Sequence, residues 1–183
     1  MKYLNIGISV LFACLLFGQV QTHLPFQLCQ LEHTNLFLGD WDAFLASLQQ
    51  MGGAVKWLGT YGIQFFDRPI IGGIIFLLPV MGLFVTTACV LRRRTKSHWL
   101  WVPLAAWLAV AQLLSLYDFN FYWWGALALC LAMGVLWFWS LLKPSLTRNI
   151  LFAFSIPFIA WLLGAVVLVY VLAGICLFVD RQC

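Results

Sequence analysis

Charged side chains are scarce in this sequence. Of its 183 residues, six are acidic and ten are lysine or arginine; charged residues make up 9% and hydrophobic residues 64%. A soluble globular domain carries about 25% charged residues, so this chain has too few polar groups to cover a surface in water. We therefore predict that lipid surrounds it and that its apolar runs are membrane helices.

Cysteine pairs that bind metals or exchange disulfides are also missing. The sequence has six cysteines but no C-x-x-C motif, so neither a zinc site nor a thioredoxin-type site is predicted. A cysteine inside an apolar run is usually a small buried hydrophobe, and four stand in such runs: Cys14, Cys89, Cys130 and Cys176. A bond between Cys29 and Cys183, which lie in polar surroundings, is left open.

The apolar segments define the expected fold class, an all-α polytopic bundle of transmembrane helices in a single membrane domain, residues 1–183. A span needs ~20 apolar residues, and the segments that qualify are 4–24, 70–91, 99–116, 121–142 and 150–179. The first could instead be a cleaved signal peptide. An uncleaved helix is favoured, because no charge stands between Tyr3 and Leu31 and no small-x-small site ends the run.

The last segment, 150–179, has an ambiguous length. As one straight helix it would measure ~45 Å, well beyond a hydrocarbon core of ~30 Å, whereas two full spans would need about forty residues. Pro157 and Gly164 are candidate break points. We expect one kinked or broken element and about five spans, with six as the alternative.

The basic residues predict the orientation, since cytoplasmic loops are enriched in lysine and arginine. The net charge of +4 is concentrated in one cluster, Arg92, Arg93, Arg94 and Lys96, and not on the broad basic face that nucleic-acid binding needs. No nucleic-acid partner is expected. With the N-terminus in the cytoplasm, Lys2, Lys143 and Arg148 also lie inside, and the insert 25–69 is extracytoplasmic with Lys56 and Arg68. Arg181 lies outside only if segment 150–179 crosses once.

Tryptophans stand at the predicted span edges, as expected for side chains with an apolar body and one polar donor. Trp99, Trp101, Trp137 and Trp139 are assigned to the inner edge, and Trp123 and Trp124 to the outer edge. A ligand-stacking platform at 122–124 is the less favoured alternative. No acidic or basic residue lies deep inside a predicted span, which argues against an ion-coupled transport path.

The insert 25–69 predicts two helices lying along the membrane surface. Trp41, Phe44, Leu45, Leu48 and Met51 share one helical face, and Gly52-Gly53 is expected to end that helix. A second, weaker segment runs from 55 to 66. Asp67 is expected to cap the following span, whose first turn suits Pro69.

The candidate site residues are acidic residues of this insert. Asp40 and Asp42 form a D-x-D pair that could hold a divalent cation. Helix capping by Asp40 and a dipole interaction of Asp42 are the favoured explanation. Glu32 has no capping role and is the candidate general base. His23 and His33 are not expected to be ligands, because no third ligand is in view.

The insert also carries a recognisable pattern: Glu32-His33, Leu36-Phe37-Leu38, Asp42, Phe44, Gly52-Gly53, Trp57-Leu58, Gln64-Phe65-Phe66, Pro69 and Gly72. It resembles the first loop of an uncharacterised family of bacterial multi-pass inner-membrane proteins, with His33 in place of a glutamine and Met51 in place of a proline. The segment from Pro157 to Gly164 is similar to a later part of that family. The layout is also similar to GT-C-type glycosyltransferases that use lipid-linked sugars. That similarity implies Glu32 as base, Asp40 or Asp42 as metal ligand, and a divalent cation as cofactor.

Three functions follow, in order of preference. The first is an integral inner-membrane protein without complete catalytic machinery, as a subunit beside other membrane subunits or as a truncated membrane domain. The second is a GT-C-like transferase, or part of one, that uses Glu32. The third is a transporter component.

Overall fold

The computed structural model describes residues 2–23, 33, 37, 39–94, 101–116, 122–143 and 146–179, and the regular elements in these ranges are helical. The prediction of an all-α fold is therefore confirmed for the described residues. The elements are α1 (Lys2–His23), α3 (Trp41–Leu48), α4 (Gly53–Ile63), α5 (Pro69–Arg94), α6 (Trp101–Leu116), α7 (Trp123–Leu141), α8 (Leu146–Leu163), the 3-10 turn η1 (Gly164–Val166) and α9 (Val167–Val179).

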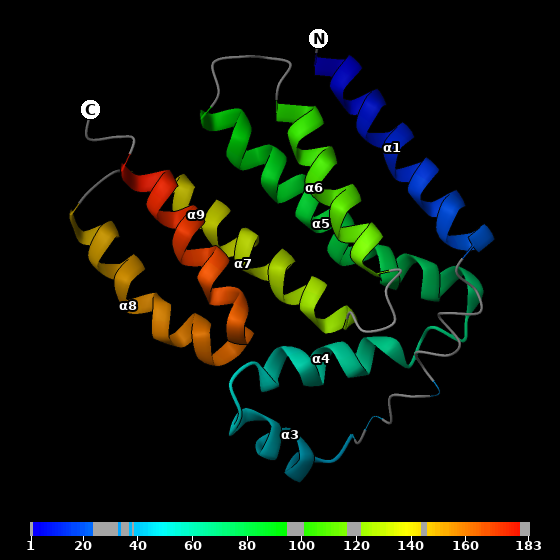
Figure 1. Cartoon of the computed structure of the whole chain (residues 1–183), viewed down its shortest axis with the longest axis horizontal. Coiled ribbons are helices and arrows are strands. Elements are labelled where there is room, and N and C mark those ends of the chain that lie inside the picture. The colour runs from blue at the N-terminus through cyan, green and yellow to red at the C-terminus, as the bar shows by residue number, and fades with distance from the viewer. Residues whose placement is uncertain are drawn as a thin grey trace.

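The long helices alternate in direction and α3 and α4 lie across one end of them (Figure 1). We call this the layer end. The opposite end holds the start of α1, the end of α5, the start of α6, the end of α7, the start of α8 and the end of α9 (Figure 1). We call it the basic end, because Arg92, Arg93, Lys143 and Arg148 belong to it. Arg93 donates from Nη1 to the carbonyl of Ser140 at 3.2 Å, which ties α5 to α7 there.

Three helical segments are long and apolar enough to cross a membrane: Ile70–Arg93, Trp123–Leu141 and Leu146–Leu177. They correspond to the predicted spans 70–91, 121–142 and 150–179. The predicted spans 4–24 and 99–116 correspond to shorter apolar stretches in the described chain, Val10–Thr22 and Trp101–Ser115.

The segment 150–179 is broken, and it turns back on itself. Gly164 adopts a left-handed conformation with φ +69° between α8 and α9, and the two helices run antiparallel (Figure 1). The rings of Phe152 and Tyr170 lie 5.0 Å apart, and the hydroxyls of Ser155 and Tyr170 are hydrogen-bonded at 2.8 Å. Of the two candidate break points, Gly164 is the turn, whereas Pro157 lies inside α8. A helix of 18 residues and one of 13 residues measure ~27 Å and ~20 Å, so each leg is shorter than a full apolar core. The length of Leu146–Leu177 that would suffice to cross a membrane is thus that of both legs together.

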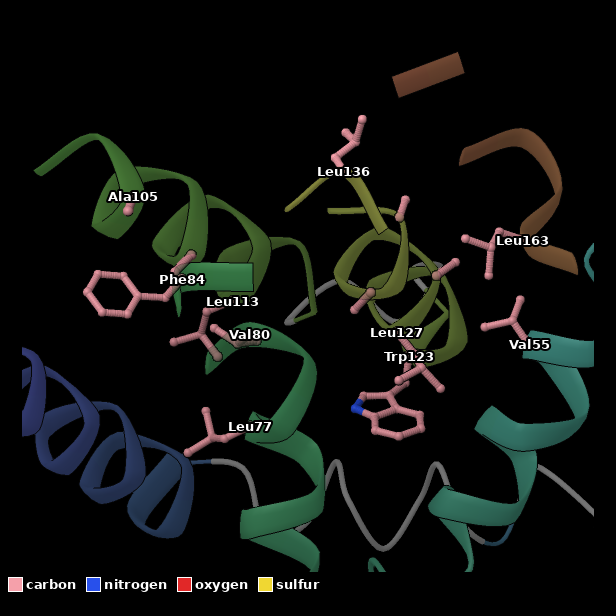
Figure 2. Close-up of a cluster of buried hydrophobic side chains, with 14 of the residues drawn as sticks. Val55, Leu77, Val80, Phe84, Ala105, Leu113, Trp123, Leu127, Leu136 and Leu163 are labelled. Carbon is pink, nitrogen blue, oxygen red and sulfur yellow. The ribbon is translucent and has the colours of Figure 1, made fainter. Parts of the chain in front are cut away.

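The apolar core is centred on α5 and α7. Figure 2 shows Leu77, Val80 and Phe84 of α5 beside Leu113 of α6, with Leu127 and Leu136 of α7 close by. Small residues allow the helices to approach closely. Fully buried alanines are Ala105, Ala109, Ala126, Ala128 and Ala132.

Two predicted helix boundaries need correction. Helix α3 ends at Leu48, and the left-handed Gly52, with φ +75°, precedes α4 instead of terminating α3. Helix α5 does begin at Pro69, but its first turn is closed by the N–H of Gly72 on the carbonyl of Arg68 at 2.6 Å. The capping position thus belongs to Arg68, and Asp67 lies exposed in the preceding turn. Proline without an N–H fits the first helical position, which explains the start.

Candidate functional site

The layer formed by α3 and α4 is the candidate site, because Asp40 and Asp42 lie at its start and the side chains of Trp41 and Tyr61 are exposed on it. Its stable part is α4, whose Val55 and Ile63 are buried. Gly59 faces α7 so closely that an added Cβ would overlap Cβ of Trp124 and lie 3.0 Å from its Cα. Helix α4 therefore rests on α7 through a surface that only glycine allows.

A second contact lies between the turn that connects α3 and α4 and the tip of the α8–α9 hairpin. The N–H of Gly52 donates to the carbonyl of Trp161 at 2.8 Å, and the indole N–H of Trp161 donates to the carbonyl of Leu48 at 2.8 Å. Gly52 and Gly164, both left-handed, meet here, since a Cβ on either would lie 3.3–3.4 Å from the Cα of the other. The turn and the tip thus contact each other backbone to backbone.

Aromatic side chains form a continuous ladder over the layer. Ring centroids are 5.3 Å apart for Trp41 and Phe44, 4.9 Å for Phe44 and Trp57, and 6.4 Å for the stacked pair Trp57 and Tyr61. Phe65 continues the series at 5.4 Å from Tyr61. Edge-on and offset pairs of this kind are the favoured aromatic geometries.

The layer also exposes large apolar side chains. Trp41 is 70% exposed and Met51 77%, while Leu45, Leu58 and Tyr61 are exposed to a lesser degree. A surface of this composition is typical of a helix that lies in a membrane interface. Trp41, Leu45 and Met51, which were predicted to share one helical face, are thus exposed on the folded layer. That this face lies in a membrane interface stays a prediction.

Trp123 does not lie in an interfacial belt. It is 4% exposed, its indole N–H donates to the carbonyl of Phe76 at 3.2 Å, and its ring meets Phe66 edge-on at 5.6 Å. This bond joins α7 to α5 one turn before Pro79. It does not replace the donor that Pro79 lacks, because that donor would bond the carbonyl of Ile75. The prediction that Trp123 lies at the outer membrane edge with its indole N–H toward the headgroups is wrong, because that N–H donates to the carbonyl of another helix.

Asp40 and Asp42 occupy the predicted positions at the start of α3, but Asp40 does not cap with its side chain. Its backbone is extended, with φ −74° and ψ 145°, and its carbonyl accepts the N–H of Phe44 at 3.1 Å. Its carboxylate forms no capping hydrogen bond with the described residues of the helix, and both aspartates are exposed. The side-chain capping explanation for Asp40 is therefore wrong, whereas Asp42 does lie in the first turn.

Glu32, the candidate general base, lies outside the described residues, as does the side chain of His23. His33 is exposed. Within the described ranges, no group of three or more histidine, cysteine or acidic side chains is placed to hold a metal ion. The roles of Glu32 as base and of Asp40 and Asp42 as metal ligands thus stay predictions.

Sequence reasoning missed two features. The first is the contact of Trp161 and Gly164 with the α3–α4 layer. The only feature of the sequence that could have indicated it is a single tryptophan three residues before a glycine in a long apolar run. Arg148, predicted to lie on the cytoplasmic side, is only 5% exposed, and its Nη2 donates to Oδ1 of Asn149 at 3.1 Å. Its burial could not be foreseen, because burial depends on tertiary packing.

Comparison with known proteins identifies a family. A family model described as "Family of unknown function (DUF6057)" matches residues 1–182. No curated protein and no solved structure matches the chain. Since the family model covers nearly its whole length, the chain belongs to the DUF6057 family of unknown function.

Proposed function

We propose that this chain is an integral membrane protein of a bacterial inner membrane, and that it works as a non-catalytic membrane subunit. The observation that carries the proposal is the outer surface of the long helices. Large apolar side chains are exposed along α5, α6 and α8, among them Leu78, Leu114 and Phe154. Exposing such a surface to water costs free energy, whereas exposing it to lipid does not, so the bilayer is the surrounding that suits it.

The separation of charges supports an orientation with the basic end in the cytoplasm. Arg92, Arg93 and Lys143 belong to one end, whereas Asp40 and Asp42 belong to the other. Positive side chains are retained on the cytoplasmic side of membrane proteins. In this orientation the α3–α4 layer lies in the outer interface, and the end of α9 returns to the cytoplasmic side.

A subunit role is consistent with the contacts that hold the α3–α4 layer against the bundle. Gly59, Gly52 and Gly164 set its position by close contact, so the layer is a fixed surface on which the rings of Trp41 and Tyr61 are exposed. Fixed aromatic surfaces suit docking, since aromatic side chains contribute much contact area at little cost in conformational entropy.

Cysteine accessibility tests both the membrane location and the orientation. In a variant without native cysteines, Asp42→Cys should react with a membrane-impermeant maleimide on intact cells, whereas Lys143→Cys should react only after permeabilisation. The reverse pattern would overturn the orientation. Recovery of the chain in the soluble fraction after lysis, with both positions labelled equally, would overturn the membrane proposal itself.

A GT-C-like transferase that uses Glu32 is the second candidate. The observation in its favour is that the carboxylate of Asp40 is exposed and is not used to cap α3, so it is accessible to a cation. Single substitutions Glu32→Ala, Asp40→Ala and Asp42→Ala should then each abolish the cellular phenotype at normal membrane levels. An unchanged phenotype in all three would eliminate this candidate and leave the subunit proposal standing.

A further inference from the structure

Helix α3 is held less firmly than the rest of the α3–α4 layer. None of its residues is buried, and it packs mainly against α4. The close glycine contacts with α7 and with the hairpin tip are made by Gly59 of α4 and Gly52 of the turn, and not by α3. The half-buried side of α3 faces α4 and consists of Ala43, Phe44, Ser47 and Leu48. Helix α3 can therefore move without opening the buried core.

Between α3 and α4 lies an indole N–H without a hydrogen-bond partner. Nε1 of Trp57 is buried and has no partner among the described residues. The Trp57 ring lies 4.9 Å from that of Phe44 on α3 and 5.2 Å from that of Phe37, which precedes α3 in the chain. A buried donor without an acceptor costs free energy. The observed position of α3, which we call closed, thus carries a penalty that movement of α3 away from Trp57 would relieve.

Two consecutive glycines stand at the point where α3 would pivot. Gly52 precedes α4 with φ +75°, and Gly53 is the first residue of α4. An added Cβ on Gly53 would overlap the carbonyl oxygen of Ser47. Glycine permits this turn and also the other backbone conformations that a moving helix requires. The pair can therefore act as a hinge while α4 stays on α7.

Trp161 of α8 holds this hinge on both sides. Its indole N–H donates to the carbonyl of Leu48, the last residue of α3, and its own carbonyl accepts the N–H of Gly52, each at 2.8 Å. One residue of the hairpin thus fixes the end of α3 relative to the turn. Because Gly164 lies against Gly52, a displacement of the hairpin tip would act on both hydrogen bonds together.

We propose that α3 is a lid over the indole of Trp57, with Gly52 and Gly53 as its hinge and Trp161 as the latch that the α8–α9 hairpin supplies. In the closed position, the layer is the docking surface of the proposed function. Movement of the hairpin tip releases α3, gives the Trp57 N–H access to acceptors outside the layer, and dismantles that surface. This regulatory consequence rests on the proposed function, whereas the lid itself rests only on the contacts of α3.

The test is the rate at which a maleimide labels Ala43→Cys in the full chain without native cysteines, in mild detergent. Ala43 lies on the half-buried side of α3, so the rate measures the population of the open lid. Trp161→Phe removes the bond to Leu48 and should raise the rate about fivefold. Replacing Trp57 by benzothienylalanine, which has the shape of tryptophan but no N–H, should lower the rate about fivefold.

Two controls accompany these variants. Benzothienylalanine in place of Trp41, which is 70% exposed on α3, should leave the rate unchanged. Ala109→Cys, at a fully buried position of α6, should react far more slowly than Ala43→Cys in every variant.

An unchanged or faster rate with benzothienylalanine at position 57 would overturn the inference, as would an unchanged rate in Trp161→Phe. Equal rates at Ala43→Cys and Ala109→Cys would assign the exposure to unfolding of the whole bundle and would also overturn it. In each case the membrane location and the orientation, tested by labelling on intact cells, would stand.

Discussion

In two regions of this molecule a glycine allows helices to come close together. The two contacts differ in which atoms of the neighbouring helix the glycine faces. At the α4–α7 contact, Gly59 faces the Cα and Cβ of Trp124, which cannot move without α7. In the α8–α9 hairpin, Gly174 faces the outer ring atoms of Phe152. An aromatic ring can change its tilt, whereas a helix backbone cannot yield alone. Glycine is therefore part of a rigid contact between α4 and α7 and of an adjustable contact between α8 and α9.

The largest effect is expected at Gly59. Gly59→Ala would place a methyl group against the Cβ and Cα of Trp124 on α7, and we expect a loss of about 3 kcal/mol in the free energy of unfolding. Reversible denaturation in mild detergent, followed by circular dichroism, measures it. The control is Gly134→Ala in α7, where an added Cβ meets no heavy atom within 4 Å. Equal stability of the two variants would show that α4 does not rest on α7 as described.

A smaller loss, of about 2 kcal/mol, is expected for Gly82→Ala, because the added methyl would overlap Sγ of Cys130 on α7. Here the obstacle is a side chain that can be removed. The double variant Gly82→Ala/Cys130→Ala should therefore be more stable than the sum of the single losses predicts. Strict additivity in the same denaturation assay would contradict the close contact of α5 with α7.

At the hairpin tip, Trp161→Phe keeps an aromatic ring but removes the hydrogen bond to the carbonyl of Leu48. We expect a loss of about 1 kcal/mol, the usual contribution of one such bond. We also expect faster labelling of a cysteine placed at Ala46 on α3. Trp107→Phe on α6, where the indole is 73% exposed, is the matched control and should change neither quantity.

The smallest effect is expected for Gly174→Ala. The ring of Phe152 can tilt away at a cost below about 1 kcal/mol, and alanine recovers a similar amount through its better helix propensity. The net change in stability should be close to zero. A loss as large as that of Gly59→Ala would mean that the hairpin is as rigid as the α4–α7 contact, and the distinction between the two regions would fall.

Several local features were predictable because they depend on neighbouring residues in the chain. The starts of α3 at Trp41 and of α5 at Pro69 follow from helical periodicity and from proline chemistry. The buried alanines of α6 and α7 follow from the preference of packed apolar helices for small residues.

The candidate site was less predictable. The carboxylate of Asp40 stands at a capping position without capping, and Trp123 is buried although its sequence position suits an interface. The burial of Trp123 depends on a partner that is distant in sequence. For Trp123 that partner is the carbonyl of Phe76, 47 residues away.

Composition and hydrophobic run lengths by themselves determined that this chain folds into apolar helices and that most of its basic residues lie near one set of helix ends. The reason is that the cost of exposing or burying a side chain is a local property. Only the tertiary structure decided that segment 150–179 returns at Gly164, and that Gly52, Leu48 and Trp161 lock the hairpin tip to the α3–α4 layer. The hydrogen bond from Trp161 to Leu48 joins residues 113 positions apart. Such a bond forms only when packing brings two helix ends together, and the periodicity of a sequence does not indicate which ends will meet.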